Sequence, residues 1–250
     1  MDMTGNTILI TGGGSGIGRG LAEAFHALGN RVIIAGRRAE VLAEVVASNP
    51  GMASVVFDVE DAAGIPGFVA GLVAAHPGLN VLINNAGIMR AEDMLAEPYA
   101  LADAEATVVT NFLGPIRLTA ALLPQLRAQK MAAVLNMSSG LAFVPLAVTP
   151  TSSATKAALH SWSQSLGHQL RKTSVQVIEV APPAVGTDLM PGSRANPNAL
   201  NLGDYISETM ALLASGPGDA EILVERVKRL RQAEAKGTYA GVFAMLNPAG

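Results

Sequence analysis

The sequence predicts an α/β fold of the doubly wound type, with one parallel sheet and helices on both of its faces. Short runs rich in β-branched residues alternate with helical segments of ten or more residues, which is the pattern of repeated βαβ units. Half of the 250 residues are hydrophobic and only 15% are charged, as expected when most strands are buried on both faces. We therefore expect a single domain over residues 1–250.

The individual elements follow from the same alternation, with glycine and proline at most of the boundaries. The expected strands are Thr7–Ile10, Val32–Ala35, Ser54–Phe57, Val81–Ile83, Val134–Asn136 and Val175–Val180. The expected helices are Gly16–Leu28, Ala39–Ser48, Ile65–Ala75, Ala100–Gln129, Thr151–Lys172 and Asp219–Lys236, with Ala100–Gln129 interrupted at Gly114-Pro115.

Charge and composition argue against several classes of partner. The net charge is −3 and no basic run is dense enough for a nucleic-acid surface. The richest basic stretch is interpreted as a solvated helix face with i,i+4 pairs to Glu221 and Glu225. Its members are Arg226, Lys228, Arg229 and Arg231.

The chain has no cysteine, so disulfides and thiolate chemistry are excluded. The N-terminus has no basic region before its apolar stretch, so we expect no signal peptide. No uninterrupted apolar run is long enough to predict a membrane span. These features favour a cytoplasmic location.

A glycine-rich loop follows the first expected strand, where residues 11–18 read TGGGSGIG and a helix then begins. Glycines allow a tight turn and a close approach of backbone N–H groups to a pyrophosphate, and the helix N-terminus adds a positive dipole end. The position between strand and helix favours a dinucleotide site over a plain turn. The residues expected to hold the cofactor here are Gly12, Ser15, Gly16, Ile17 and Gly18.

This spacing, T-G-x-x-x-G-x-G, resembles the short-chain dehydrogenase/reductase family, and the resemblance extends from about Thr7 to Thr187. Further motifs in family order support it: Asp58-Val59, Asn84-Asn85-Ala86-Gly87, Asn111, Ser138-Ser139, Lys156, and Pro182 followed by Thr187. The resemblance implies a single-domain Rossmann fold and an oxidoreductase. It also implies further cofactor-binding residues, namely Asp58, Val59, Asn85, Ala86, Gly87, Lys156, Pro182, Val185 and Thr187.

The end of the second expected strand favours NADP(H) over NAD. The position where an acidic residue would bind a ribose 2′-hydroxyl holds Gly36, and Arg37 and Arg38 follow. A guanidinium pairs well with a phosphate, which a carboxylate would repel. Arg37 is therefore expected to bind the 2′-phosphate.

By resemblance, the catalytic group consists of an Asn, a Ser, a Tyr and a Lys, with the Tyr four residues before the Lys. Asn111, Ser139 and Lys156 match three of these positions, and Ser138 is the alternative to Ser139. In the family the Lys lowers the pKa of the phenol, which then protonates the substrate oxygen while the Ser donates a hydrogen bond.

The fourth position holds Ser152 in place of the tyrosine. An alkyl hydroxyl is a far weaker acid than a phenol, whose pKa is about 10, and it is several ångströms shorter. None of the three tyrosines, Tyr99, Tyr205 and Tyr239, stands four residues before a lysine. We therefore expect impaired reduction of ordinary ketones.

Three explanations for Ser152 remain open. The chain is an engineered or inactivated carbonyl reductase, or it reduces an iminium substrate that arrives already protonated, or it is a non-catalytic NADP-binding protein. The first two imply hydride transfer to a C=O or C=N bond of a small apolar substrate. Residues 188–216, rich in proline and glycine, are expected to form a substrate lid.

The C-terminal part departs from the family. Pro183 stands where a glycine is usual, and the late glycine-rich segment is missing, so a seventh strand and the usual tetramer are in doubt. By resemblance, the helices Ala100–Gln129 and Thr151–Lys172 predict a homodimer. The four histidines, His160 among them, show no metal-ligand spacing and are assigned structural roles, so no metal is expected.

Overall fold

The computed structural model describes residues 1–99, 101–216 and 218–248. Within them lies a seven-stranded parallel sheet with the strand order β3-β2-β1-β4-β5-β6-β7. The strands are β1 (Thr7–Thr11), β2 (Arg31–Gly36), β3 (Ala53–Val56), β4 (Val81–Asn84), β5 (Ala132–Met137), β6 (Val175–Val180) and β7 (Glu221–Ile222). The doubly wound prediction is confirmed, and each of the six expected strands is present within about two residues of its expected bounds.

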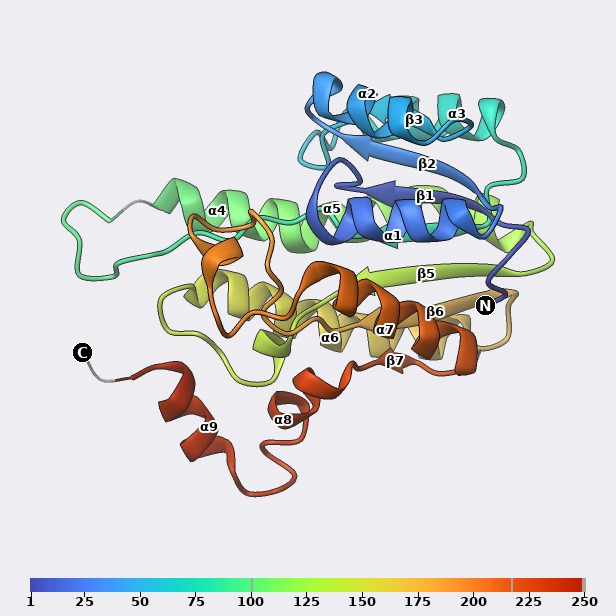
Figure 1. The fold of residues 1–250 in the computed structure, drawn as a ribbon. Coiled ribbons are helices and arrows are strands. Elements are labelled where there is room, and N and C mark those ends of the chain that lie inside the picture. The colour runs from blue at the N-terminus through green and yellow to red at the C-terminus, as the bar shows by residue number, and fades with distance from the viewer. Residues whose placement is uncertain (100, 217, 249–250) are drawn as a thin grey trace.

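Helices cover both faces of the sheet (Figure 1). They are α1 (Gly16–Ala27), α2 (Ala39–Ser48), α3 (Ile65–Ala75), α4 (Leu101–Val108), α5 (Gly114–Arg127), α6 (Pro150–Leu170), α7 (Leu202–Ser215), α8 (Lys228–Arg231) and α9 (Tyr239–Leu246). Single turns lie at η1 (Val109–Leu113), η2 (Gly140–Ala142), η3 (Ser193–Ala195) and η4 (Glu225–Val227).

The hydrophobic core forms two layers because successive strand residues point to opposite faces. In β1, Ile8 and Ile10 pack in one layer with Leu21 of α1 and Leu213 of α7. Leu9 lies between them in sequence but packs in the other layer, with residues of α3 and α5. The central strands are therefore buried on both sides, which explains their almost uninterrupted hydrophobic sequence.

The helix predicted for residues 100–129 is not interrupted at Gly114-Pro115. Ala100 lies outside the described residues, and helical structure runs through α4, the π-helical turn η1 and α5. The π turn ends at Leu113, and Pro115 follows Gly114 in the first turn of α5, so the backbone widens just before the residue that lacks an N–H donor.

This same stretch, Leu101–Arg127, is long and apolar enough to cross a membrane, with a mean hydropathy of 1.3. Nearly half of its most apolar window, 44%, is buried inside the structure. Leu118, Leu122 and Leu126 from this stretch belong to the core layer that covers the sheet. Packing against the sheet accounts for the buried part of this apolar stretch.

The prediction of one continuous helix over Asp219–Lys236 is wrong, although a short part of the segment is helical. Glu221 and Ile222 instead form β7, which pairs with Glu179 and Val180 of β6, and the chain then forms η4 and α8. The open edge of β6 provides backbone hydrogen-bond partners that outweigh the local helical pattern. The seventh strand that the sequence left in doubt is therefore present.

Two glycine substitutions are predicted to change stability in opposite directions. A Cβ on Gly13 would lie 2.6 Å from Cβ of Ile34 in β2, so Gly13→Ala should lower the free energy of unfolding by about 1–3 kcal/mol. A Cβ on Gly71, inside α3, would meet no packing neighbour within 4 Å, so Gly71→Ala should raise it by about 0.5–1 kcal/mol. Urea denaturation of both variants checks this, and shifts of the same sign would contradict it.

Candidate active site

A cavity of about 1280 Å³ lies along the carboxyl ends of the strands, beside the point where strand order reverses between β1 and β4. In doubly wound sheets this is where ligands bind. The cavity is bordered by all the predicted site residues except Asn111. They are Gly12, Ser15, Gly16, Ile17, Gly18, Arg37, Asp58, Val59, Asn85, Ala86, Gly87, Ser139, Ser152, Lys156, Pro182, Val185 and Thr187.

The glycine loop has the geometry of a cradle. Gly12 has a φ of +66°, which a residue with a side chain rarely adopts. A Cβ on Gly18 would lie 2.3 Å from both the Gly12 carbonyl oxygen and Nδ2 of Asn85. The loop leads into the first turn of α1, whose N–H groups have no partners within the helix. These donors and the helix dipole suit a pyrophosphate.

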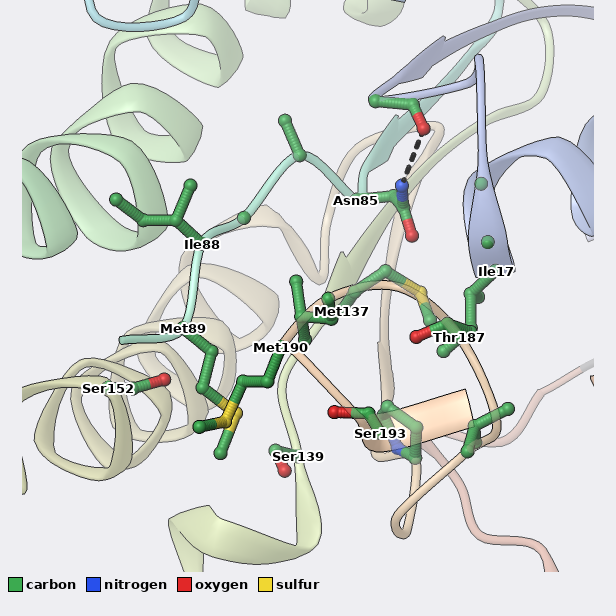
Figure 2. A pocket seen from close by; sticks show the side chains of 18 of the residues that line it. Ile17, Asn85, Ile88, Met89, Met137, Ser139, Ser152, Thr187, Met190 and Ser193 are labelled. Atoms are coloured by element: carbon green, nitrogen blue, oxygen red, sulfur yellow. Dashed lines mark hydrogen bonds between the residues drawn. The ribbon is translucent and has the colours of Figure 1, made fainter. Parts of the chain in front are cut away.

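Hydrogen bonds fix this loop to the turn after β4. The Thr11 hydroxyl oxygen accepts from the backbone N–H groups of Asn85 and Ala86, both at 3.0 Å. The Asn85 side-chain amide donates back to the Thr11 carbonyl at 2.9 Å. In Figure 2 Asn85 and Ile17 lie on neighbouring walls of the pocket. The two predicted cofactor segments therefore form one rigid unit.

The two predicted arginines follow β2, and they lie near an acid after β3, Glu60, that the sequence alone did not indicate. Arg37 lies 3.6 Å from Oε1 of Glu60, and that carboxylate also accepts a 2.6 Å hydrogen bond from the Thr110 hydroxyl. Arg38 is exposed and has no acidic partner among the described residues. Glu60 follows the Asp58-Val59 motif directly, which was the only sequence signal for it.

Ser139, Ser152 and Lys156 all border the cavity, and in Figure 2 the Ser152 hydroxyl points into the pocket beside Met89. The Ser139 oxygen accepts from the N–H of Leu141 at 3.1 Å, which leaves its proton free to donate. Ser138 instead donates to buried Glu179. The geometry thus favours Ser139 over Ser138 as the donor to a substrate.

Lys156 lies on the cavity wall, and its ammonium donates to the Met137 carbonyl at 2.8 Å. Burial lowers the pKa of Lys156 to about 8. Lowered lysine pKa values are common at functional sites, where a group must exchange a proton near neutral pH.

Asn111 is buried behind the cavity, in the π turn η1. Its Oδ1 accepts from the Ile88 N–H at 2.8 Å, and its Nδ2 donates to the Ile88 carbonyl and to the Thr155 hydroxyl. A side chain at Gly87 would come 3.2 Å from Asn111 and 3.7 Å from the Lys156 ammonium. Asn111 therefore positions the cavity wall next to Lys156. Its predicted role in a proton relay stays a prediction.

None of the three tyrosines borders the cavity in the part of the chain that the structure describes. Tyr205 is fully buried, in a cluster with Val185, Val224 and Val227, and burial raises its pKa. Tyr99 donates to Glu92 at 2.7 Å, and Tyr239 stacks on Phe243 in α9. No other tyrosine thus takes the place that Ser152 occupies.

His160 lies in a polar cluster that its sequence neighbourhood did not reveal. Its Nδ1 is 2.6 Å from Glu179 and 3.8 Å from Glu221, and a ligand atom of each residue lies within 4.8 Å of the others. Arg231 binds both oxygens of Glu221, at 3.0 and 3.1 Å, and Ser138 binds Glu179. Both carboxylates thus have partners within the protein, and these contacts link β6, β7 and α6.

Comparison with known proteins agrees with this geometry. Residues 6–198 match the short chain dehydrogenase family. The uncharacterized oxidoreductase DltE of Bacillus subtilis (strain 168) is 42% identical over 249 residues, which cover 99% of this chain and 98% of that protein.

Two solved structures show the same fold with different nucleotides. A metagenomic short-chain oxidoreductase in complex with NADP has a TM-score of 0.75 at 30% identity, covering 88% of this chain and 97% of its own. A 3-ketoacyl-(acyl-carrier-protein) reductase from Brucella melitensis complexed with NADH has a TM-score of 0.77 at 25% identity, covering 87% and 93%. The chain belongs to the short-chain dehydrogenase family and is an oxidoreductase of that family.

The lowered pKa of Lys156 predicts a pH-dependent stability. Because the folded-state pKa is about 8 and the ordinary value is 10.5, the unfolded chain binds the proton more tightly. The destabilisation is complete below pH 8 and is relieved as the pH rises to 10.5. Lys156→Met should remove it, about 3 kcal/mol at most.

Urea denaturation at several pH values from neutral to alkaline checks this prediction. The advantage of Lys156→Met over the parent protein should shrink as the pH rises. The exposed Lys236, outside the cavity, provides the control variant Lys236→Met. A difference between Lys156→Met and the parent that does not change with pH would contradict the assignment.

Proposed function

We propose that this protein is an NADPH-dependent oxidoreductase that transfers hydride to a C=O or C=N bond of a small, largely apolar substrate. The observation that carries the proposal is the cavity itself. It joins a glycine cradle and two arginines at one end to Ser139 and Lys156 further along.

The residues present fit a pyridine dinucleotide phosphate. Gly12 and Gly18 let the loop pack directly against Asn85, where a Cβ would collide, and the α1 N-terminus offers N–H donors to a pyrophosphate. Arg38, which has no acidic partner among the described residues, and Arg37 suit the 2′-phosphate. When bound, the nucleotide supplies the hydride.

The protein's own groups then orient and polarise the substrate. The Ser139 hydroxyl donates to the substrate oxygen, and Met89 and Met190 provide an apolar wall. Ser152 stands where a phenol would act as the acid, and its alkyl hydroxyl is a poor proton donor. Because burial lowers the pKa of Lys156 to about 8, its ammonium can return a proton to a water molecule that has protonated the substrate.

A second candidate function, imine reduction, is favoured by the absence of tyrosine from the cavity border among the described residues. An iminium ion carries its proton before hydride arrives, so it does not need the phenol. Turnover of cyclic imines without turnover of ketones would support this alternative. Tight NADPH binding without turnover of either would instead support a non-catalytic NADP-binding protein.

Ser152→Tyr should increase ketone reduction by about 10²–10⁴-fold, because it restores a general acid of suitable pKa. The matched control is Ser152→Phe, which fills the same space without a hydroxyl. NADPH oxidation on a panel of ketones measures the rates, and calorimetry measures NADPH binding by each variant. Equal rates for the Tyr and Phe variants, with NADPH still bound, would overturn the predicted role of position 152.

The cofactor preference gives a separate prediction. Replacing both Arg37 and Arg38 by Ala should weaken NADPH binding by about 10–100-fold and leave NADH binding nearly unchanged, because only NADPH carries the 2′-phosphate. Arg19→Ala is the control, since Arg19 lies on α1 outside the cavity and pairs with Glu23. An equal loss for both nucleotides would argue against phosphate recognition by these arginines.

A further inference from the structure

A second pair of arginines borders the cavity at the end opposite Arg37 and Arg38. Arg226 lies in η4 and Arg229 in α8, beyond β7 at the other edge of the sheet. Both side chains are exposed, and neither has an ion pair or side-chain hydrogen bond among the described residues. They are therefore free cations on the wall of a cavity.

Packing of the segment determines which of its basic residues face the cavity. Val227 is buried and Leu230 partly buried, and both pack against Gly140, where a Cβ would meet them at 2.9 and 2.7 Å. Gly140 directly follows Ser139, so this contact holds the segment beside the candidate catalytic group. Arg226 and Arg229 are three residues apart and lie on one side of these helical turns.

The other two basic residues of the segment are neutralised by acids. Lys228 donates to Glu225 at 2.7 Å, and Arg231 binds Glu221. The predicted i,i+4 pairs are therefore wrong: Lys228 pairs with a residue three positions away and Arg231 with one ten positions away. Arg226 and Arg229 are exposed, as predicted for a solvated face, but neither is paired. The free pair faces the cavity and the bound pair does not border it.

No free acid opposes the pair at this end of the cavity in the described chain. Asp188 borders the cavity but is bound by Arg194, and the other bordering acids, Asp58 and Glu60, follow β3 at the cofactor end. Two unpaired guanidiniums in a concave site attract anions. Planar guanidiniums match the oxygens of a carboxylate or phosphate.

Apolar side chains lie around the same arginines. Leu230 of α8, Leu141 of η2, and Met245 and Leu246 of α9 border the cavity near them. An apolar wall next to paired cations suits a molecule with a hydrophobic body and one anionic group.

We propose that Arg226 and Arg229 bind an anionic oxygen group of the substrate, a carboxylate or a phosphate, and hold the reducible bond near Ser139. The proposal rests on the proposed function, because it names the substrate class of the same cavity. It makes the substrate class more specific: a largely apolar molecule that carries an acid group at one end.

The test is calorimetry on NADP⁺-saturated protein with three unreactive probes of similar size: benzoate, phenyl phosphate and the neutral benzamide. At least one anion should bind about tenfold or more tightly than benzamide. Whichever of benzoate and phenyl phosphate binds more tightly identifies the acid group as a carboxylate or a phosphate. The Arg226→Gln/Arg229→Gln double variant should lose that advantage.

Lys228→Gln is the matched control. It removes a positive charge from the same segment, but Lys228 pairs with Glu225 and does not border the cavity. It should retain the preference for the anion. Equal binding of all three probes, or an unchanged anion affinity in the double variant, overturns the proposal. If NADP⁺ does not bind, the proposed function fails, and the same titrations on the protein alone still decide whether the arginines bind an anion.

Discussion

The hydrogen bonds between Thr11 and the turn after β4 are the constraint on which the cavity depends. They join the loops of β1 and β4, the two neighbouring strands between which strand order reverses. Sterics reinforce them, because the glycine loop and Asn85 approach so closely that a Cβ on Gly18 would overlap both. A dinucleotide site at this point is thus largely pre-formed and needs little ordering on binding.

Buried polar contacts extend this rigidity across the sheet to the candidate catalytic group. Asn84 of β4 donates to Asn136 of β5 at 2.8 Å, and Asn136 donates to Ser163 of α6 at 2.9 Å. Further along, His160 of α6 contacts Glu179 of β6. Since α6 also carries Ser152 and Lys156, both networks fix where these two side chains stand relative to Ser139. Paired buried polar groups are costly to disrupt, which makes them effective in holding a geometry.

The chemistry of the site follows from combining this rigid frame with a weak acid. Hydride transfer needs a positioned nucleotide and a polarised acceptor, and the frame suits both. Proton transfer needs an acid matched to the pH, and an alkyl hydroxyl at Ser152 does not meet that need. Under the proposed function, the proton would come from the substrate itself or from a water molecule beside Lys156. A substrate held at its far end by Arg226 and Arg229 would gain from orientation what it loses in acid catalysis.

The sequence by itself determined the parallel α/β architecture, the glycine cradle, and the residues that meet around the cavity. The architecture and the cradle rest on local patterns, namely strand and helix periods and glycine spacing. Most of the cavity residues were identified by the resemblance to the short-chain dehydrogenase/reductase family. Only the tertiary structure decided that Glu221 and Ile222 form a strand, that Glu60 approaches Arg37, and that His160 meets two acids. It alone separated Arg226 and Arg229 from their paired neighbours. Each of these contacts joins residues that no local period relates, so packing and the open edge of β6 determined them.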